Sequence, residues 1–254
     1  FLVRVLSSLR RKAVSGNRGG SPNPFLPHDP AMFVAEVSDT HLCLLNKFNV
    51  VEHHVLIVTR RFEPQERLLG PADFEALWAC MSQYDALGFY NGGEIAGASQ
   101  RHKHLQMIPL PMDPSGPSVP LAAVVERAAL DHRIDAIQTL PFRHALTGTD
   151  PAWLREPNQS AGAAAERYRA LLHAGGITPD SRGDLPPYNL LATRTWMMLI
   201  PRSRECVDSI SVNALGFAGS LLARNEREKA LIEAIGPLEI LKRVASAGDN
   251  RTTR

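Results

Sequence analysis

Three short apolar segments follow one another early in the chain, at residues 32–37, 43–51 and 54–59. The third is dense in valine, leucine and isoleucine, and polar residues separate all three. Short apolar runs bounded in this way are typical of consecutive β-strands. The first part of the chain is therefore predicted to contribute several neighbouring strands to a sheet.

Further elements are expected along the rest of the chain. We expect strands at 87–90, 101–110, 139–146 and 188–201, the last as one long strand or a pair. Apolar residues at helical spacing predict helices at 1–12, 71–84, 120–131, 161–174, 214–234 and 237–245. Strands mixed with helices without regular alternation indicate an α+β fold.

Two segments, 46–61 and 188–203, share a polar start, an apolar run and a basic end. The similarity is compatible with an internally duplicated second half, although unrelated strands often share such a pattern. We divide the chain into an N-terminal catalytic part, residues 1–115, and a C-terminal part, residues 116–254, which completes the sheet and the substrate pocket.

Composition narrows the functional class. With 254 residues, 44% of them hydrophobic, the chain can bury a sizeable core. Its net charge of +2 fits an anionic small-molecule substrate and is too weak to argue for nucleic acid. No apolar run approaches the ~20 residues of a membrane span. Three widely spaced cysteines argue against a disulfide framework or a cysteine-built zinc site and favour a cytoplasmic location.

The segment GASQRHKHLQ, residues 97–106, is the most informative part of the sequence. On a strand, side chains alternate between faces, so His102, His104 and Gln106 would point the same way, opposite to Lys103 and Leu105. On a helix, the two histidines would diverge by about 200°. The strand interpretation is therefore the one that builds a site.

Such a face suits chemistry at phosphorus. A neutral imidazole, with an unperturbed pKa of about 6.5, is a good nucleophile near neutral pH. Its attack gives a phosphoramidate that a second nucleophile can open, while the partner imidazole orients the nucleophile or assists the leaving group. Gln106 can donate an N–H group to a phosphate oxygen. Small residues at 97–100 can offer backbone N–H groups to a phosphate.

Less specific interpretations compete with this one. With nine histidines in the chain, a His-x-His pair can arise by chance or bind a metal, although a metal site needs a third ligand. His53 and His54 are adjacent and point to opposite faces of a strand, so they cannot both join one site; we interpret them as structural.

The surrounding sequence resembles a known family. GASQRHKHLQ is similar to the His-x-His-x-Gln motif of histidine triad transferases. The match extends to LLNKFNVVEHHVLIVTRRF, FYNGGEIAGASQRHKHLQMIPLP, LPFRHAL, YNLLATRTWMMLIPRS and NALGFAGSLLARNE. These segments resemble, in the same order, those of ATP adenylyltransferases, also called diadenosine tetraphosphate phosphorylases. The resemblance implies a histidine-triad-like antiparallel sheet flanked by helices.

The resemblance also implies a reaction. His104 would attack an α-phosphorus of diadenosine tetraphosphate, ATP would leave, and AMP would stay on the histidine. Inorganic phosphate would then take the AMP to give ADP, and the sequence of steps is reversible. His102 would support His104, and Gln106 would be the glutamine of the motif. A divalent cation, magnesium, is expected on the polyphosphate itself, with no protein ligand set for a metal.

Further contacts with substrate are implied by resemblance alone. Lys47 would hold polyphosphate as a point charge. Ser220 stands where the family commonly has a larger apolar residue, and Arg224 where a lysine is usual, which leaves the nucleotide preference open. The implied substrate-binding residues are Lys12, Asn46, Lys47, Asn91, Gly97, Ala98, Ser99, Gln100, Gln106, Asn213, Ala214, Leu215, Ser220 and Arg224.

Other functions remain open at this point. A hexose-1-phosphate uridylyltransferase shares the motif and would use a sugar phosphate as acceptor. A dinucleoside polyphosphate hydrolase would use water, and a nucleotide-binding sensor would form no product. The expected partners are nucleotides and inorganic phosphate, without nucleic acid or membrane, and the sequence does not indicate an oligomeric state.

Overall fold

The computed structural model describes residues 1–5, 23–49, 51–128 and 133–247. Its centre is an eight-stranded, wholly antiparallel sheet in the order β2-β3-β4-β6-β5-β8-β9-β7. The strands are β2 (Phe33–Glu36), β3 (His41–Leu45), β4 (Val55–Thr59), β5 (Ala86–Gly92), β6 (His104–Pro109), β7 (Ala145–Gly148), β8 (Tyr188–Ala192) and β9 (Trp196–Pro201).

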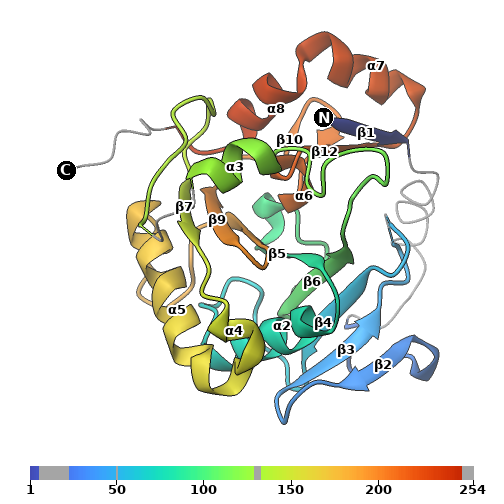
Figure 1. Ribbon diagram of the computed structural model, residues 1–254. Helices are drawn as coiled ribbons and strands as arrows, with labels where there is room; N and C mark the ends of the chain where they lie inside the picture. The colour runs from blue at the N-terminus through green and yellow to red at the C-terminus, as the bar shows by residue number, and fades with distance from the viewer. Residues whose placement is uncertain (6–22, 50, 129–132, 248–254) are drawn as a thin grey trace.

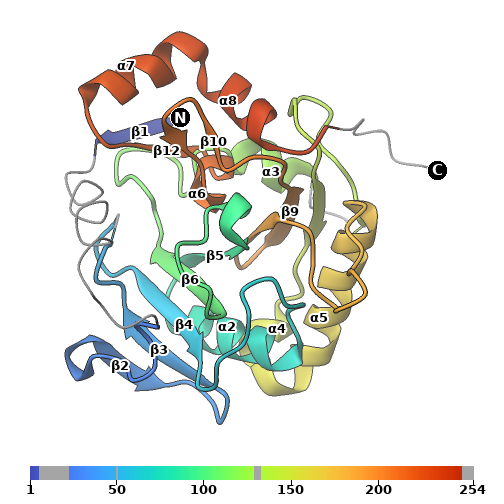
Figure 2. The ribbon, with the colours of Figure 1, turned by 180° about the vertical axis from the view of Figure 1, so that it is seen from behind.

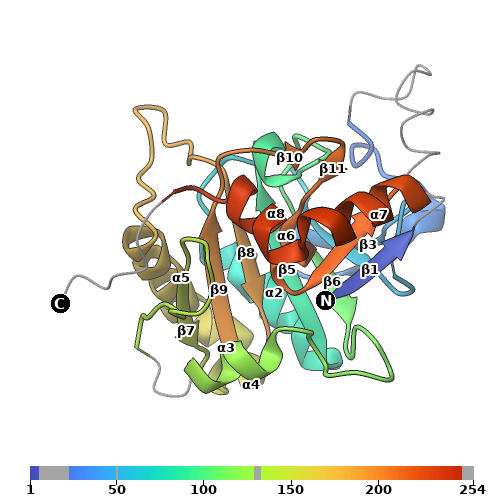
Figure 3. The ribbon, with the colours of Figure 1, turned by 90° about the horizontal axis from the view of Figure 1, so that it is seen from above.

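Helices cover both faces of this sheet (Figure 1). On one face, α2 packs against α5, and α4 lies against both. On the other face, α6 contacts β5 and β8 beneath α7 and α8 (Figure 3). The helices are α2 (Pro71–Gln83), α3 (Ala122–Ala128), α4 (Ala152–Arg155), α5 (Pro157–Ala174), α6 (Ala214–Phe217), α7 (Glu226–Ile235) and α8 (Pro237–Val244), with 3-10 turns η1 (Pro30–Met32) and η2 (Glu94–Ala96).

Two large apolar cores, on opposite faces of the sheet, follow from the alternation of side chains along the strands, and a small third cluster joins Phe25 to β3 and β4. Leu105 and Met107 of β6 face the core under α2 and α5. Phe89 of β5 and Met198 of β9 face the opposite core, which α3, α6 and α8 complete. The predicted α+β fold, an antiparallel sheet flanked by helices, is confirmed.

The two halves of the sheet repeat one order of elements. In the first half, β4, α2, β5 and β6 follow in sequence, and the strands lie in the order β4-β6-β5. In the second half, β7, α5, β8 and β9 follow in sequence and lie in the order β7-β9-β8. The halves meet where β5 pairs with β8. The segments matched by sequence, 46–61 and 188–203, are not equivalent in this repeat, because β4 corresponds to β7.

Several sequence predictions were accurate to within a few residues. The strands at 32–37 and 54–59, the helices at 71–84 and 237–245, and the strand pair at 188–201 all form. The helix expected at 161–174 begins earlier, at Pro157. The helix expected at 120–131 forms as α3 as far as it is described.

Other predictions were wrong in their bounds. The strand expected at 43–51 ends at Leu45, because Asn46 turns its side-chain oxygen to the N–H of Phe48. The strand expected at 101–110 begins only at His104. The strand expected at 139–146 is largely loop, and β7 covers Ala145–Gly148.

A small parallel pair of strands contradicts two predicted helices. Residues Leu2–Val5 form β1, which pairs with β12 (Ser220–Ala223); the rest of the predicted helix 1–12 lies outside the described residues. The predicted helix 214–234 is interrupted because Gly219 adopts a φ of 97° and Asn225 caps a new helix, α7. A hairpin of β10 (Cys206–Val207) and β11 (Ile210–Ser211) lies nearby.

Within the described part of the chain, no helix is both long and apolar enough to cross a membrane. Seen from behind, β2, β3 and β4 form one end of the sheet, which extends beyond the helices (Figure 2).

Candidate active site

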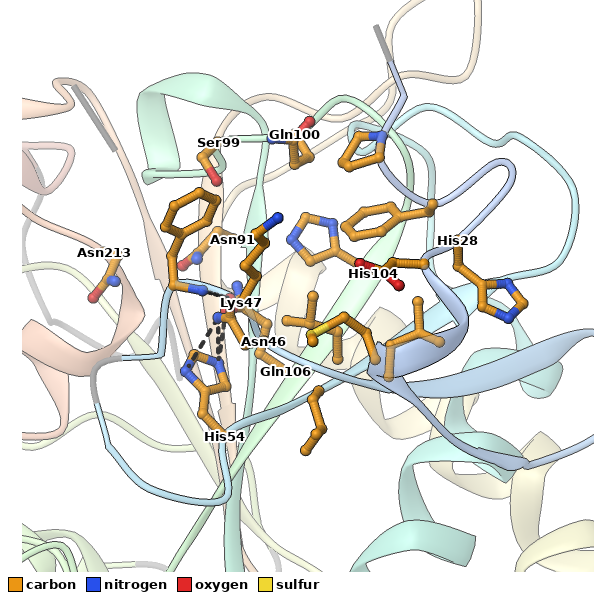
Figure 4. Close-up of a pocket in the computed structure, with 18 of the residues that line it drawn as sticks. His28, Asn46, Lys47, His54, Asn91, Ser99, Gln100, His104, Gln106 and Asn213 are labelled. Carbon is orange, nitrogen blue, oxygen red and sulfur yellow. Dashed lines mark hydrogen bonds between the residues drawn. The ribbon is translucent and has the colours of Figure 1, made fainter. Parts of the chain in front are cut away.

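A cavity of about 250 Å³ lies over β3, β4 and β6. Apolar side chains, among them Phe25, Leu44 and Leu56, line part of the cavity, and polar side chains line most of the remainder. A pocket with an apolar wall and a few converging polar groups suits a flat heterocycle joined to a charged chain. The polar lining comes from His28, Asp29, Asn46, Lys47, His54, Asn91, Ser99, Gln100, His104, Gln106 and Asn213 (Figure 4).

His104, the predicted nucleophile, stands at the first position of β6 and lines the cavity. Its Nδ1 lies 2.7 Å from the carbonyl oxygen of His102. A carbonyl oxygen can only accept a hydrogen bond, so Nδ1 carries the hydrogen and the lone pair of the neutral ring is on Nε2. The imidazole is therefore held in the tautomer that attack by Nε2 on phosphorus requires.

His102 supports this arrangement from outside the cavity lining. Its Nε2 lies 2.8 Å from the carbonyl oxygen of Thr59, to which it donates, and its Nδ1 accepts from the amide of Asn23 at 3.0 Å. Burial lowers the pKa of His102 and so favours the neutral ring, and it outweighs the hydrogen bond to Thr59, which raises that pKa. His102 thus fixes His104 through its own carbonyl group.

Phe25 lies across both histidines. Its ring centroid is 5.5 Å from that of His102 and 5.4 Å from that of His104, and it is almost fully buried. Phe25 could not be selected from the sequence, because the segment that contains it has neither helical nor strand periodicity. It closes one side of the cavity and restricts the rotation of the His104 ring.

The opposite face of the motif is anchored by buried charges, as the alternation predicts. The Lys103 ammonium group lies 2.7 Å from Glu63 and 3.1 Å from Asp73. Asp73 also accepts from His41 at 3.2 Å. Burial alone would raise the pKa of Asp73, but the His41 hydrogen bond and the charge of Lys103 outweigh it and lower that pKa. Asp73 remains an anion that ties β6 to α2 and β3.

Gln106 is oriented by a residue that sequence reasoning set aside. The Nε2 of His54 lies 3.0 Å from the side-chain oxygen of Gln106, and the amide nitrogen of Asn46 lies 3.3 Å from the His54 Nδ1. Since the Gln106 oxygen accepts from His54, the Gln106 amide N–H groups are directed elsewhere, toward the cavity that Gln106 lines. His54 is thus part of the site, while His53 is exposed with a φ of 58°.

Only the register between β4 and β6 places His54 in the site, and the sequence does not show that register. Leu56 pairs with Gln106 and Val58 pairs with His104 in the β4–β6 ladder. His54 therefore lies two residues before Leu56, on the same face as Gln106. The structure corrects the purely structural interpretation of His54.

The loop at 97–100 meets the second half of the chain. Gly97 has a φ of 91°, and a Cβ atom there would lie 2.9 Å from the Cβ of Asn213. Only glycine allows this approach. Ser99 and Gln100 line the cavity with Gly97, whereas Ala98 lines an adjoining hollow with Glu66, Glu94 and Arg101.

Asn91 connects the loop to the downstream stretch. Its side-chain oxygen accepts from the backbone N–H of Ala214 at 3.0 Å and from the amide of Asn189 at 2.9 Å. Asn213 lines the cavity and caps α6 through Leu215 N–H at 3.0 Å. Ala214 and Leu215 thus serve the site through their backbone N–H groups.

Three predicted contacts lie apart from the cavity lining or outside the described chain. Ser220 is buried on β12, with no hydrogen-bond partner for its hydroxyl among the described residues. Arg224 pairs with Glu228 at 2.5 Å. Leu222, which lies between Ser220 and Arg224 in sequence, lines the cavity. Lys12 lies outside the described residues. Their contacts with substrate stay predictions.

Metal ligands are scarce in this part of the molecule. Among residues 1–5, 23–49, 51–128 and 133–247, no group of three His, Cys, Asp or Glu side chains could hold a metal ion. Asp29 is the single carboxylate among the described residues that line the cavity.

An antiparallel α+β sheet that presents His104 and Gln106 of a His-x-His-x-Gln motif to a pocket, with His102 held just before the strand, is typical of a nucleotidyltransferase of the histidine triad type. Residues 1–127 match the pattern of the Ap4A phosphorylase N-terminal domain, and residues 138–247 match that of the ATP adenylyltransferase C-terminal domain. The chain belongs to the Ap4A phosphorylase and ATP adenylyltransferase family.

Individual relatives agree with this assignment. Diadenosine 5',5'''-P1,P4-tetraphosphate phosphorylase 2 of Saccharomyces cerevisiae is 27% identical over 248 residues, which cover 87% of this chain and 74% of that protein. The crystal structure of yeast Ap4A phosphorylase Apa2 in complex with Ap4A has a TM-score of 0.70 at 23% identity, covering 96% of this chain and 84% of the other. The AMP complex of Apa2 gives 0.70 at 24%, covering 95% and 82%. These structures share the fold.

Proposed function

We propose that this chain cleaves diadenosine tetraphosphate by phosphorolysis, giving ATP and ADP through an AMP–histidine intermediate on His104. The observation that carries the proposal is the hydrogen bond from His104 Nδ1 to the His102 carbonyl, which fixes the neutral ring in the tautomer whose lone pair is on Nε2. The yeast relative named as a diadenosine tetraphosphate phosphorylase supports the choice of substrate.

In the first step, the Nε2 of His104 attacks an α-phosphorus. A P–N bond forms while the bond from phosphorus to the bridging oxygen breaks, and ATP leaves with that electron pair. Negative charge moves onto the α-phosphate oxygens and the leaving oxygen. The amide of Gln106, held by His54, and the backbone N–H groups of Ser99 and Gln100 would stabilise this charge, whereas those of Gly97 and Ala98 donate to the carbonyl groups of Glu94 and Gly93.

In the second step, an oxygen of inorganic phosphate attacks the AMP phosphorus from the side that ATP has left. The P–N bond breaks, its electron pair returns to Nε2, and ADP forms. Lys47, at the centre of the cavity lining, supplies positive charge for the polyphosphate and later for phosphate (Figure 4). Because a P–N bond replaces one P–O bond and is then replaced by another, the reaction can run in both directions.

Magnesium is proposed as a counter-ion that arrives on the nucleotide and neutralises polyphosphate charge. A cytoplasmic location is also part of the proposal. It is supported by the three cysteines, which are free thiols and spaced without a disulfide pattern.

The decisive experiment separates the products formed by the wild-type chain and by His104→Ala, with diadenosine tetraphosphate and magnesium, with and without inorganic phosphate. We expect ATP and ADP from the wild-type chain only when phosphate is present, and no product from His104→Ala. ATP and AMP without phosphate would instead identify a hydrolase. No product with phosphate, but turnover of a nucleoside diphosphate sugar with a hexose 1-phosphate, would identify a uridylyltransferase-type enzyme.

A further inference from the structure

Gln65 is a fully buried side chain that none of the sequence motifs includes. It lies in the connection between β4 and α2 and has an exposed fraction of 0%. Its side-chain oxygen accepts from the backbone N–H of His104 at 2.9 Å. Its side-chain nitrogen donates to the carbonyl oxygen of His104 at 3.2 Å and to that of Asn91 at 2.9 Å. One amide group thus binds the main chain of two residues of the site.

These contacts replace missing pairing between two central strands. The β5–β6 ladder ends where Phe89 pairs with Gln106. Continued in the same register, the ladder would set Asn91 opposite His104, but the strands separate before that point. The amide of Gln65 stands between them and occupies both the donor and the acceptor positions that the main chain of Asn91 would have filled.

The backbone of Gln65 is itself fixed on two sides. Its N–H donates to the carbonyl oxygen of Arg101 at 2.9 Å, and its carbonyl oxygen accepts from the hydroxyl of Tyr90 at 2.5 Å. Tyr90 is fully buried. The inserted amide is therefore a rigid bridge, so the position of the His104 backbone depends on it.

We propose that Gln65 is a positioning residue for the nucleophile: it holds the separated ends of β5 and β6 so that His104 and Asn91 face the cavity at a fixed spacing. Without this bridge, β6 would close onto β5 or fray at its first residue, which is His104. The imidazole would then move relative to the phosphorus. A shift of about 1 Å in a reacting group can cost ~100-fold in rate.

The test compares three variants, and its activity arm rests on the proposed function. Gln65→Met keeps the length of the side chain and removes all three hydrogen bonds. Gln65→Glu keeps the acceptor for the His104 N–H but offers no amide N–H to the two carbonyl groups. Leu69→Ala is the control, because Leu69 is equally buried in the same connection and packs only in the apolar core under α2.

The first readout is the single-turnover rate of AMP transfer to His104, quenched in alkali, in which a P–N bond survives. We expect Gln65→Met and Gln65→Glu to slow this step by at least tenfold, with KM for diadenosine tetraphosphate within threefold of wild type, in the range expected for a misplaced reactive group. Leu69→Ala should lose stability but keep the rate. A wild-type rate in folded Gln65→Met, or an equal loss in Leu69→Ala, would overturn the proposal.

The second readout does not depend on the reaction. Hydrogen exchange at the His104 backbone amide should be at least tenfold faster in Gln65→Met than in wild type, and unchanged in Leu69→Ala, since only the first variant removes its acceptor. Unchanged exchange in Gln65→Met would refute the bridging role. If wild type forms no AMP adduct while the exchange result holds, the proposed function fails and the positioning role of Gln65 stands.

Discussion

In the first half of the sheet, β4 and β6 turn His104, Gln106 and the preceding His54 toward a cavity, whereas in the second half the corresponding strands turn apolar side chains into two cores. Every residue of β9 is buried, and none lines the cavity. A repeated order of strands and helices therefore does not repeat a site. Chemistry is built in one half, and the second half supports it.

The support reaches the site through a buried arginine. Arg202, directly after β9, donates to Asn189 at 2.6 Å and to the carbonyl oxygens of Arg204 at 2.7 Å and Ala96 at 3.4 Å. Burial lowers its pKa to about 10, so it stays protonated at neutral pH. Asn189 in turn donates to Asn91. The second half thus fixes the positions of Asn91 and the end of the turn that precedes the 97–100 loop.

The largest expected effect tests this support. Arg202→Met should lower the free energy of unfolding by about 3 kcal/mol or more, because several buried acceptors lose their donor and each costs about 1–3 kcal/mol. Urea unfolding measures the loss. Arg243→Met is the matched control: its solvent-exposed pair with Glu239 on α8 should contribute little to stability. Equal stabilities for the two variants would mean that the buried hydrogen bonds of Arg202 do not hold the site in place.

The next effect is catalytic and belongs to the first half. His54→Phe removes the donor that orients Gln106, so the Gln106 amide can rotate away from the phosphate. We expect kcat to fall by about 10- to 100-fold, less than the ~100- to 1,000-fold typical for deletion of a transition-state donor itself. Steady-state kinetics with diadenosine tetraphosphate measures the change. His53→Asn is the control, since His53 is exposed and asparagine tolerates its positive φ. A similar loss in both variants would show that a disturbed connection between β3 and β4, and not loss of the His54–Gln106 contact, lowers kcat.

Local patterns were sufficient for elements whose signal lies within one segment. Helix α2 begins at Pro71 with Asp73 bonded back to Gly70, and β4 is a run of β-branched and leucine residues. The β1–β12 pair could not be predicted, because Leu2 pairs with Ser220 and neither segment identifies the other. A parallel partner so distant in sequence converts a pattern that fits a helix into a strand.

The residues of the site also fall into those that the sequence could predict and those that it could not. His104 and Gln106 follow from alternation along one strand, so the motif alone placed them together. Phe25, His54 and Gln65 contribute through contacts between segments that are far apart in sequence. Strand register and loop insertion determine those contacts, and neither leaves a periodic signal. The prediction from sequence was therefore most reliable for residues that share a strand with the nucleophile.

The smallest effect is expected at His144, which is the counterpart of His54 in the second half. Each histidine directly precedes the first strand of its half, but His144 serves packing alone: its Nε2 accepts from Ile137 N–H and its Nδ1 donates to Phe142, both at 2.8 Å. Burial lowers the pKa of His144, outweighing the effects of Phe142 and Asp135, which raise it. Protonation would remove the acceptor that Ile137 uses.

The sign of the pH dependence follows from that shift. The unfolded chain binds a proton at His144 near pH 6.5, while the folded chain resists it, so stability is full above about pH 6.5 and declines as the pH falls. His144→Gln keeps a donor and an acceptor but does not titrate. Between pH 7.5 and 5.5, urea unfolding should show a decline about 1 kcal/mol smaller for His144→Gln than for wild type. Part of the decline should remain in His144→Gln, because burial also lowers the pKa of His102. Identical declines would mean that protonation of His144 does not lower the free energy of unfolding. The contrast between a packing histidine in the second half and a site histidine in the first would then fail.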